Sequence, residues 1–199
     1  MLLCDIGNTS YHFLDLEYNY KEDVNKFNPS SIDTKVFYIC VNPKVKIVLE
    51  SLVNWIDISK NVDMKNYYET MGIDRIVACE AIKNGVIVDA GSAITVDVVK
   101  DGIFQGGFIY PGVRAMSNSY KNISSALDYK FNFSIDLCKL PKNSQDAISY
   151  GYLKNLFTEV NSYNLPIYLT GGDSKEFSQL FPSAKIDEML IFKGMKKLI

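Results

Sequence analysis

The sequence predicts an α/β protein of two similar halves, each with a mixed sheet flanked by helices. Short apolar runs alternate with segments of helical spacing along the chain, which is typical of this class. Two of the runs end alike, in a buried strand, an aspartate and a glycine turn. Asp5 and Asp89 hold this position and lie 84 residues apart. The chain is therefore expected to repeat, with halves at 1–84 and 85–199.

The first half begins with a short apolar strand, a glycine turn and a returning strand. A third strand follows, because its residues are β-branched and aromatic. A polar stretch at 18–33 is rich in Asn, Lys and Ser and is expected to be a loop or insertion. Trp55 is expected to be a core residue of an apolar helix. The predicted elements are strands at 2–5, 11–16 and 35–41 and helices at 45–53 and 74–83.

The second half repeats three strands before its first helix. Lys100-Asp101-Gly102 has the composition of a hairpin turn between two of them. Ser144 is expected to cap a long helix. The predicted elements are strands at 85–89, 94–99, 103–110 and 166–169 and helices at 115–127, 144–160 and 187–195.

Composition excludes several classes of function. The formal charge is −2, and no basic run suggests nucleic-acid binding. No segment approaches the length of a membrane span, and the first residues lack the basic region of a signal peptide. Four widely spaced cysteines fit reduced thiols of a cytoplasmic protein. With His12 as the only histidine, acid–base chemistry is expected to fall to carboxylates and other groups.

The turn after Asp5 suits a nucleoside triphosphate. Gly7 lets the backbone approach closely, and Asn8 and Thr9 can donate hydrogen bonds to phosphate oxygens. Asp5 itself would repel phosphate, so it is expected to hold Mg²⁺ or its waters. A plain β-turn explains the same residues, and alone the motif is not decisive.

Two further turns extend this pattern. Asp89-Ala90-Gly91-Ser92 has the same order of strand, acid, glycine and hydroxyl, and as a pair the two acidic turns are expected to face each other across a cleft that holds the nucleotide. Thr170-Gly171-Gly172-Asp173 offers a backbone surface without Cβ atoms, on which an adenosine can lie. Alone, the third turn is equally compatible with a helix cap at Asp173 or Ser174.

Gly72-Ile73-Asp74-Arg75 supplies the groups that phosphate transfer to an alcohol requires. A carboxylate can accept the proton of a weakly nucleophilic hydroxyl, which suggests Asp74. Arg75 offers a forked donor for a carboxylate or phosphate. A helix start, with Asp74 as its cap and Arg75 in solvent, is the alternative interpretation.

These motifs, in this order, resemble the actin, Hsp70 and sugar-kinase superfamily, and within it the type III pantothenate kinases. Gly106-Gly107-Phe108-Ile109-Tyr110-Pro111-Gly112 and the closing segment 188–195 are similar to segments of that family. The resemblance implies two ribonuclease-H-like, actin-like ATPase halves around a nucleotide cleft. It also implies transfer of phosphate from ATP to pantothenate, the first step of coenzyme A synthesis, in a cytoplasmic homodimer.

The resemblance further assigns roles to residues. Asp74 is implied as the general base and Asp89 as the ligand of a monovalent cation, K⁺ or NH₄⁺. Tyr67 and Tyr68 both qualify as a pantothenate-binding tyrosine, with Tyr68 preferred. Implied ATP-binding residues are Asp5, Ile6, Gly7, Asn8, Thr9, Ser10, Tyr11, His12 and Ser92. Implied pantothenate-binding residues are Tyr68, Gly72, Ile73, Asp74, Arg75 and Ser144.

Two other functions remain compatible with these residues. One is a different small kinase or phosphatase of the superfamily, which a substrate panel with ATP and potassium would separate. The other is a non-catalytic nucleotide-binding regulator, which would bind ATP and pantothenate without forming product. The presence of Asp5, Asp74 and Asp89 together favours an enzyme.

Overall fold

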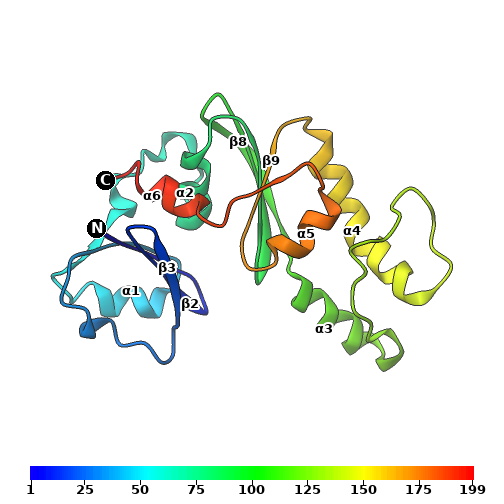
Figure 1. Ribbon diagram of the computed structural model, residues 1–199, viewed down its shortest axis with the longest axis horizontal. Coiled ribbons are helices and arrows are strands. Elements are labelled where there is room, and N and C mark those ends of the chain that lie inside the picture. The colour runs from blue at the N-terminus through cyan, green and yellow to red at the C-terminus, as the bar shows by residue number, and fades with distance from the viewer. The chain divides into compact units, whose positions relative to one another are not determined.

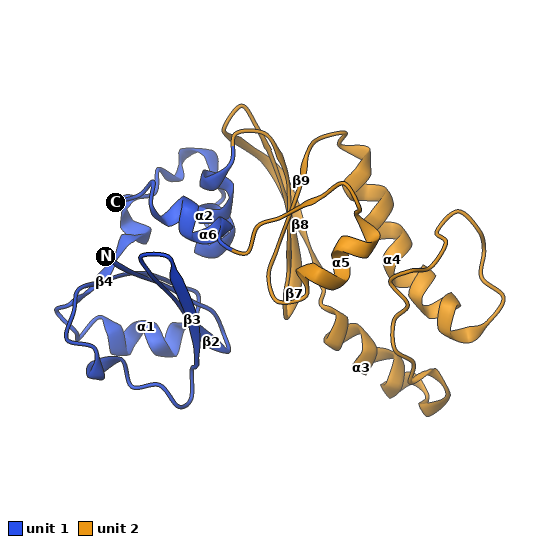
Figure 2. Ribbon diagram, in the orientation of Figure 1, with its two compact units in different colours: residues 1–82, 189–199 blue, residues 83–188 orange.

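The computed structural model describes residues 1–199, which form two compact units (Figure 2). Unit 1 comprises residues 1–82 together with 189–199, and unit 2 comprises residues 83–188. Each unit is built on its own five-stranded sheet. None of the helices has the length and apolar character that crossing a bilayer requires.

Figure 1 labels some of the helices and strands of both units. Unit 1 contains β1 (Leu2–Ile6), β2 (Ser10–Asp15), β3 (Tyr18–Asp23), η1 (Pro29–Ser31), β4 (Val36–Cys40), α1 (Pro43–Leu49), β5 (Trp55–Asp57), η2 (Ile58–Asn61), η3 (Met64–Asn66), α2 (Ile73–Ala81) and α6 (Leu190–Met195). Unit 2 contains β6 (Gly85–Ala90), β7 (Ala93–Lys100), β8 (Ile103–Pro111), α3 (Val113–Ile123), η4 (Ser125–Leu127), α4 (Ser144–Ser162), β9 (Ile167–Thr170), α5 (Ser174–Leu180) and β10 (Lys185–Ile186).

The two sheets share one topology. Unit 1 has the order β3-β2-β1-β4-β5 and unit 2 the order β8-β7-β6-β9-β10. In each, the first three strands form an antiparallel meander and the last two run parallel to the first. β1 and β6, which carry Asp5 and Asp89, are therefore equivalent central strands. The predicted α/β class with two similar mixed sheets is confirmed.

The unit 1 sheet buries both of its faces. On one face, Cys4, Ile6 and Phe13 pack with Val45 and Leu49 of α1. Because successive side chains of a strand alternate between faces, the other face carries residues such as Leu3 and Ile39, which pack against α2 and α6. Removing the helices from either face would expose apolar strand residues to water.

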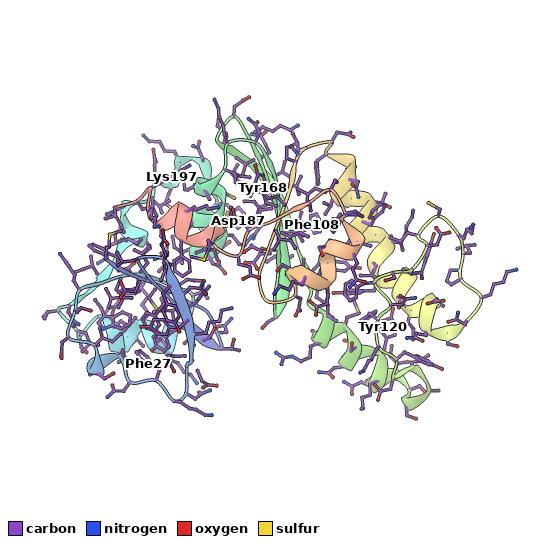
Figure 3. The ribbon with its side chains drawn as sticks, viewed as in Figure 1. Phe27, Phe108, Tyr120, Tyr168, Asp187 and Lys197 are labelled. Atoms are coloured by element: carbon purple, nitrogen blue, oxygen red, sulfur yellow. The ribbon has the colours of Figure 1, made fainter.

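The unit 2 sheet packs one face against α4 and α5. Alternate residues of β6 and β7, such as Val88 and Val96, form a core with Leu153 of α4 and Phe177 of α5. Phe108 of β8 lies at the margin of this core, and Figure 3 shows it on the sheet.

Three expectations about local structure were wrong. Residues 18–23 form the edge strand β3, where Tyr20 stacks on Phe13 with ring centroids 4.9 Å apart. An edge strand tolerates the polar residues that suggested a loop. Trp55 is buried as expected but begins strand β5, not a helix. The long helix α4 is capped by Asn143, whose side chain accepts from Asp146 N, so Ser144 is its first residue.

The last residues also differ from expectation. The predicted halves placed 189–199 in the second half, whereas this segment belongs to unit 1. The reason is close helix packing, because α6 lies against α2 with Gly194 on the Val77 backbone. Lys197, labelled in Figure 3, adds a hydrogen bond of 2.5 Å from its Nζ to Glu80 O. A helix that follows unit 2 in sequence therefore completes the core of unit 1.

Candidate active site

The predicted first phosphate turn is a tight connection between β1 and β2. Gly7 N donates to Ser10 O at 3.0 Å, which leaves Asn8 and Thr9 exposed at the tip. The flanking Ile6 and Tyr11 are buried in the α1-side core. Within the predicted ATP-binding run, therefore, the tip offers side chains to a ligand, whereas Ile6 and Tyr11 offer only their main chain.

Asp5 lies at the carboxyl end of β1, opposite His12 of β2 and Ile39 of β4. Strand alternation places it on the same face as Leu3, the face that packs against α2 and α6. The ring of His12 contacts Phe192 of α6 edge to face, with centroids 4.8 Å apart. His12 is therefore packed between sheet and helix, whereas Asp5 lies on the same side of the sheet as the helix that carries Asp74.

Asp74 is the second residue of α2 and lies in the first turn of the helix. Its Oδ1 accepts a hydrogen bond of 2.8 Å from Arg75 N. Gly72, not Asp74, is the cap residue, which corrects the alternative derived from the sequence. A methyl group on Gly72 would lie 2.5 Å from Asp74 Oδ1, so the glycine leaves room for the carboxylate.

Arg75 is buried and does not extend into solvent. Only 6% of its surface is exposed, and its Nη1 donates to the hydroxyl of Tyr68 at 2.5 Å. Tyr68 is 45% exposed, so the pair connects a buried cation to the surface. Tyr67 OH instead donates to Glu80 Oε1 at 2.7 Å, further along α2. These contacts associate Tyr68, and not Tyr67, with the start of α2.

The predicted second phosphate turn joins β6 to β7. Gly91 lies within this turn, and Gly112 packs against it. Gly91 N donates to Ala93 O at 3.0 Å, and Ser92 is exposed. A Cβ on Gly112 would overlap the carbonyl oxygens of Gly91 and Ser92, so the start of α3 abuts this turn. In the sequence, Pro111 and Gly112 belong to a segment similar to one of the type III pantothenate kinases, but it contained no signal for this packing.

The predicted adenosine turn reaches the same end of the unit 2 sheet. Gly171 has a left-handed φ of 86°, and a side chain there would overlap Ala90 O and Asp89 Oδ1. Asp173 N donates to Ala90 O at 2.9 Å. Burial and the neighbouring Glu176 raise the pKa of the Asp173 carboxyl, and Arg114 opposes this rise. Parallel pairing of β6 with β9 thus brings two of the three predicted motifs together.

Ser144 stands apart from these contacts. It is exposed in the first turn of α4, whose neighbours Gln145 and Asp146 bond to Lys130 O and to the Asn132 side chain. Besides the Asn143 cap, the start of α4 is therefore held by hydrogen bonds to the segment 130–132.

No cluster of three or more His, Cys, Asp or Glu side chains forms a protein-only metal centre. Single carboxylates can still bind the expected cations together with other ligands. Mg²⁺ is commonly bound through one or two carboxylates, waters and substrate phosphates. Asp5 would supply such a carboxylate, and Asp89, beside the main-chain oxygen of Ala90, would supply oxygen ligands for K⁺.

Comparison with known proteins identifies relatives that match the whole chain. The type III pantothenate kinase family matches residues 19–164. A type III pantothenate kinase of Sulfurimonas denitrificans is 65% identical over 100% of this chain and 97% of its own length. That of Campylobacter jejuni subsp. jejuni is 40% identical over 100% of this chain and 96% of its own length.

Among solved structures, one from Campylobacter jejuni is described as a "conserved putative Baf family transcriptional activator". It has a TM-score of 0.90 and 39% identity, and the match covers 100% of this chain and 97% of that one. The (R)-2-hydroxyglutaryl-CoA dehydratase component A of Acidaminococcus fermentans shares the fold alone, with a TM-score of 0.52 and 11% identity over 100% and 98% of the two chains.

Proposed function

The chain belongs to the type III pantothenate kinase family, and from this premise we propose which of its residues carry the reaction. The protein transfers phosphate from ATP to pantothenate in coenzyme A synthesis. We assign catalysis to Asp74. The observation that carries this assignment is the position of Asp74 in the first turn of α2. This helix packs on the face of the unit 1 sheet that also carries Asp5.

Asp74 is proposed to accept the proton of the pantothenate hydroxyl as phosphate is transferred. Its hydrogen bond from Arg75 N fixes one carboxylate oxygen and leaves the other for the hydroxyl. A fixed base and a bound alcohol reduce the entropy cost of bringing the reactants together. Gly72 and Ile73 would line the same site through their main chain.

Arg75 is proposed to bind the carboxylate of pantothenate, with Tyr68 beside it. The guanidinium is a planar donor that can bind both oxygens of a carboxylate. The 2.5 Å hydrogen bond to Tyr68 orients the guanidinium, and the partly exposed Tyr68 would contact the substrate from the surface. Ser144 is a further proposed contact to pantothenate.

The phosphates of ATP are proposed to bind the turns that follow β1 and β6. Asn8, Thr9 and Ser10 would donate to them from one turn and Ser92 from the other. Main-chain groups of residues 5–12 complete this set. Mg²⁺ near Asp5 and K⁺ or NH₄⁺ at Asp89 would offset the negative charge that develops during transfer.

We propose a cytoplasmic homodimer, since ATP and pantothenate are cytoplasmic substrates and the family resemblance implies pairing. A groove of 620 Å³ between β8 and α4 offers an apolar floor from Phe108, Tyr110 and Leu156 with a polar rim that includes Lys154 and Glu159. Such a floor is typical of a subunit contact. Light scattering in solution measures the mass directly, and a monomer would refute this part.

A coupled assay with pantothenate and ATP, with and without potassium, tests the proposed function. Formation of 4′-phosphopantothenate that rises when potassium is added is expected. Turnover of a sugar in place of pantothenate would instead indicate another kinase of the same fold.

Removal of one tyrosine hydroxyl tests the pantothenate site. Tyr68→Phe is expected to raise KM for pantothenate by about tenfold with little change in kcat, because a charge-assisted hydrogen bond to Arg75 is lost. Tyr67→Phe is the matched control, since its hydroxyl bonds to Glu80. Steady-state kinetics of both variants checks this, and an equal rise in KM for the control would contradict the assignment.

A further inference from the structure

The first turn of α3 lies against the second phosphate turn. Gly112 precedes the helix, and its backbone is so close to the carbonyl groups of Gly91 and Ser92 that no Cβ fits between them. Arg114 follows two residues later and is exposed. The guanidinium is therefore carried by a helix start that Ser92 and Gly112 hold in place.

Arg114 is also close to the predicted adenosine turn without being paired there. Its charge lowers the pKa of Asp173, against the rise that burial causes. The two side chains nevertheless form no ion pair within 4.0 Å, and Arg114 forms no other salt bridge. Asp173 is tied to Ala90 O through its N–H. Arg114 is thus available to a ligand between these turns.

A phosphate ligand at this end of the unit 2 sheet would lie near several acidic side chains. Asp89, Asp173 and Glu176 are all acidic, and a triphosphate would add several negative charges. Lys175 forms an ion pair with Glu188, with Nζ and Oε1 3.9 Å apart. A cation that faces these turns would favour phosphate binding.

The chemistry of arginine also favours phosphate binding at position 114. Arg75 and Arg114 are the only arginines among 21 basic residues of the chain. Arginine presents two parallel donors to a phosphate or carboxylate, which lysine cannot do. Arg75 occupies the proposed pantothenate site, and Arg114 occupies the first turn of the helix beside Ser92.

We propose that Arg114 binds the phosphates of ATP beside Ser92 and so sets the preference for phosphorylated nucleotides. The proposal rests on the proposed ATP-binding role of the second phosphate turn. Arg114 is a binding residue in this scheme, because it moves no proton.

Calorimetric titration with ADP and with adenosine separates phosphate contacts from base contacts. Arg114→Gln is expected to weaken ADP binding by roughly tenfold or more and to leave adenosine binding unchanged. Arg114→Lys should recover part of the loss. Lys121→Gln is the matched control, because it removes one positive charge from the same helix at a residue already paired with Asp128 at 2.7 Å. Its ADP affinity should match that of the wild type.

The opposite outcomes would overturn the proposal. An unchanged ADP affinity in Arg114→Gln, an equal loss for adenosine, or an equal loss of ADP binding in Lys121→Gln would each do so. The titrations contain no pantothenate and measure no turnover. The two proposals can therefore fail separately. If the wild type did not phosphorylate pantothenate but Arg114→Gln still bound ADP more weakly than the wild type, this inference would be supported and the proposed function contradicted.

Discussion

Replacing Asp74 with asparagine is expected to lower kcat by about a thousandfold, within the range for removal of a general base. The amide keeps an oxygen that can accept the 2.8 Å hydrogen bond from Arg75 N, so the start of α2 stays intact. What disappears is the ability to take the proton from the substrate hydroxyl. The coupled assay at saturating ATP and pantothenate measures the loss.

Asp33→Asn is the matched control for this substitution. Asp33 is an exposed residue of the same unit before β4, and its replacement makes the same change in charge. Its kcat should equal that of the wild type, and both variants should bind ATP normally. If Asp74→Asn kept more than about a tenth of the wild-type kcat while remaining folded, Asp74 would not be the base.

Replacing Gly194 with alanine is expected to lower the free energy of unfolding by about 3 kcal/mol, because an overpacked site with no room to relax is costly. The new methyl would overlap the carbonyl oxygen of Val77 on α2. That atom belongs to a buried helix backbone and cannot move as a side chain does. Since α2 also carries Asp74, kcat should fall as well.

Trp55 gives a local measurement of this effect. It is the only tryptophan and lies in the core of unit 1, so urea denaturation followed by its fluorescence reports the unit that contains Gly194. Gly151→Ala on α4 is the matched control, because only Tyr120 Oη lies near the new methyl, at 3.8 Å. Gly151→Ala should leave unchanged the urea concentration at which half of the Trp55 fluorescence change has occurred. Equal midpoints for both variants would show that the α2–α6 contact contributes little.

The repeat of strands and acidic turns was predictable from the sequence, because short apolar runs and glycine turns are local signals. β3 was not, since its solvated edge residues look like those of a loop. The sequence favoured Tyr68 over Tyr67 but offered no contact that separates the two. Adjacent aromatic residues look alike in sequence, and only their partners, Glu80 and Arg75, separate them.

Contacts between distant segments had no local signal either. Gly112 resembles any strand-ending glycine, yet it fixes the turn at Ser92. Gly194 resembles an ordinary interruption of a weak helix, yet it is the point where α6 meets α2. In both cases the requirement for glycine comes from a backbone far away in the sequence.

The return of residues 189–199 to unit 1 affects the order in which the protein can fold on the ribosome. Unit 2 is one uninterrupted stretch of chain, whereas unit 1 lacks α6 until after unit 2 has been translated. Domains generally fold as units during synthesis, with N-terminal ones first. Unit 1 is therefore expected to emerge first but to complete its core only after α6 is made, and until then the part of α2 that packs against α6 lacks its partner.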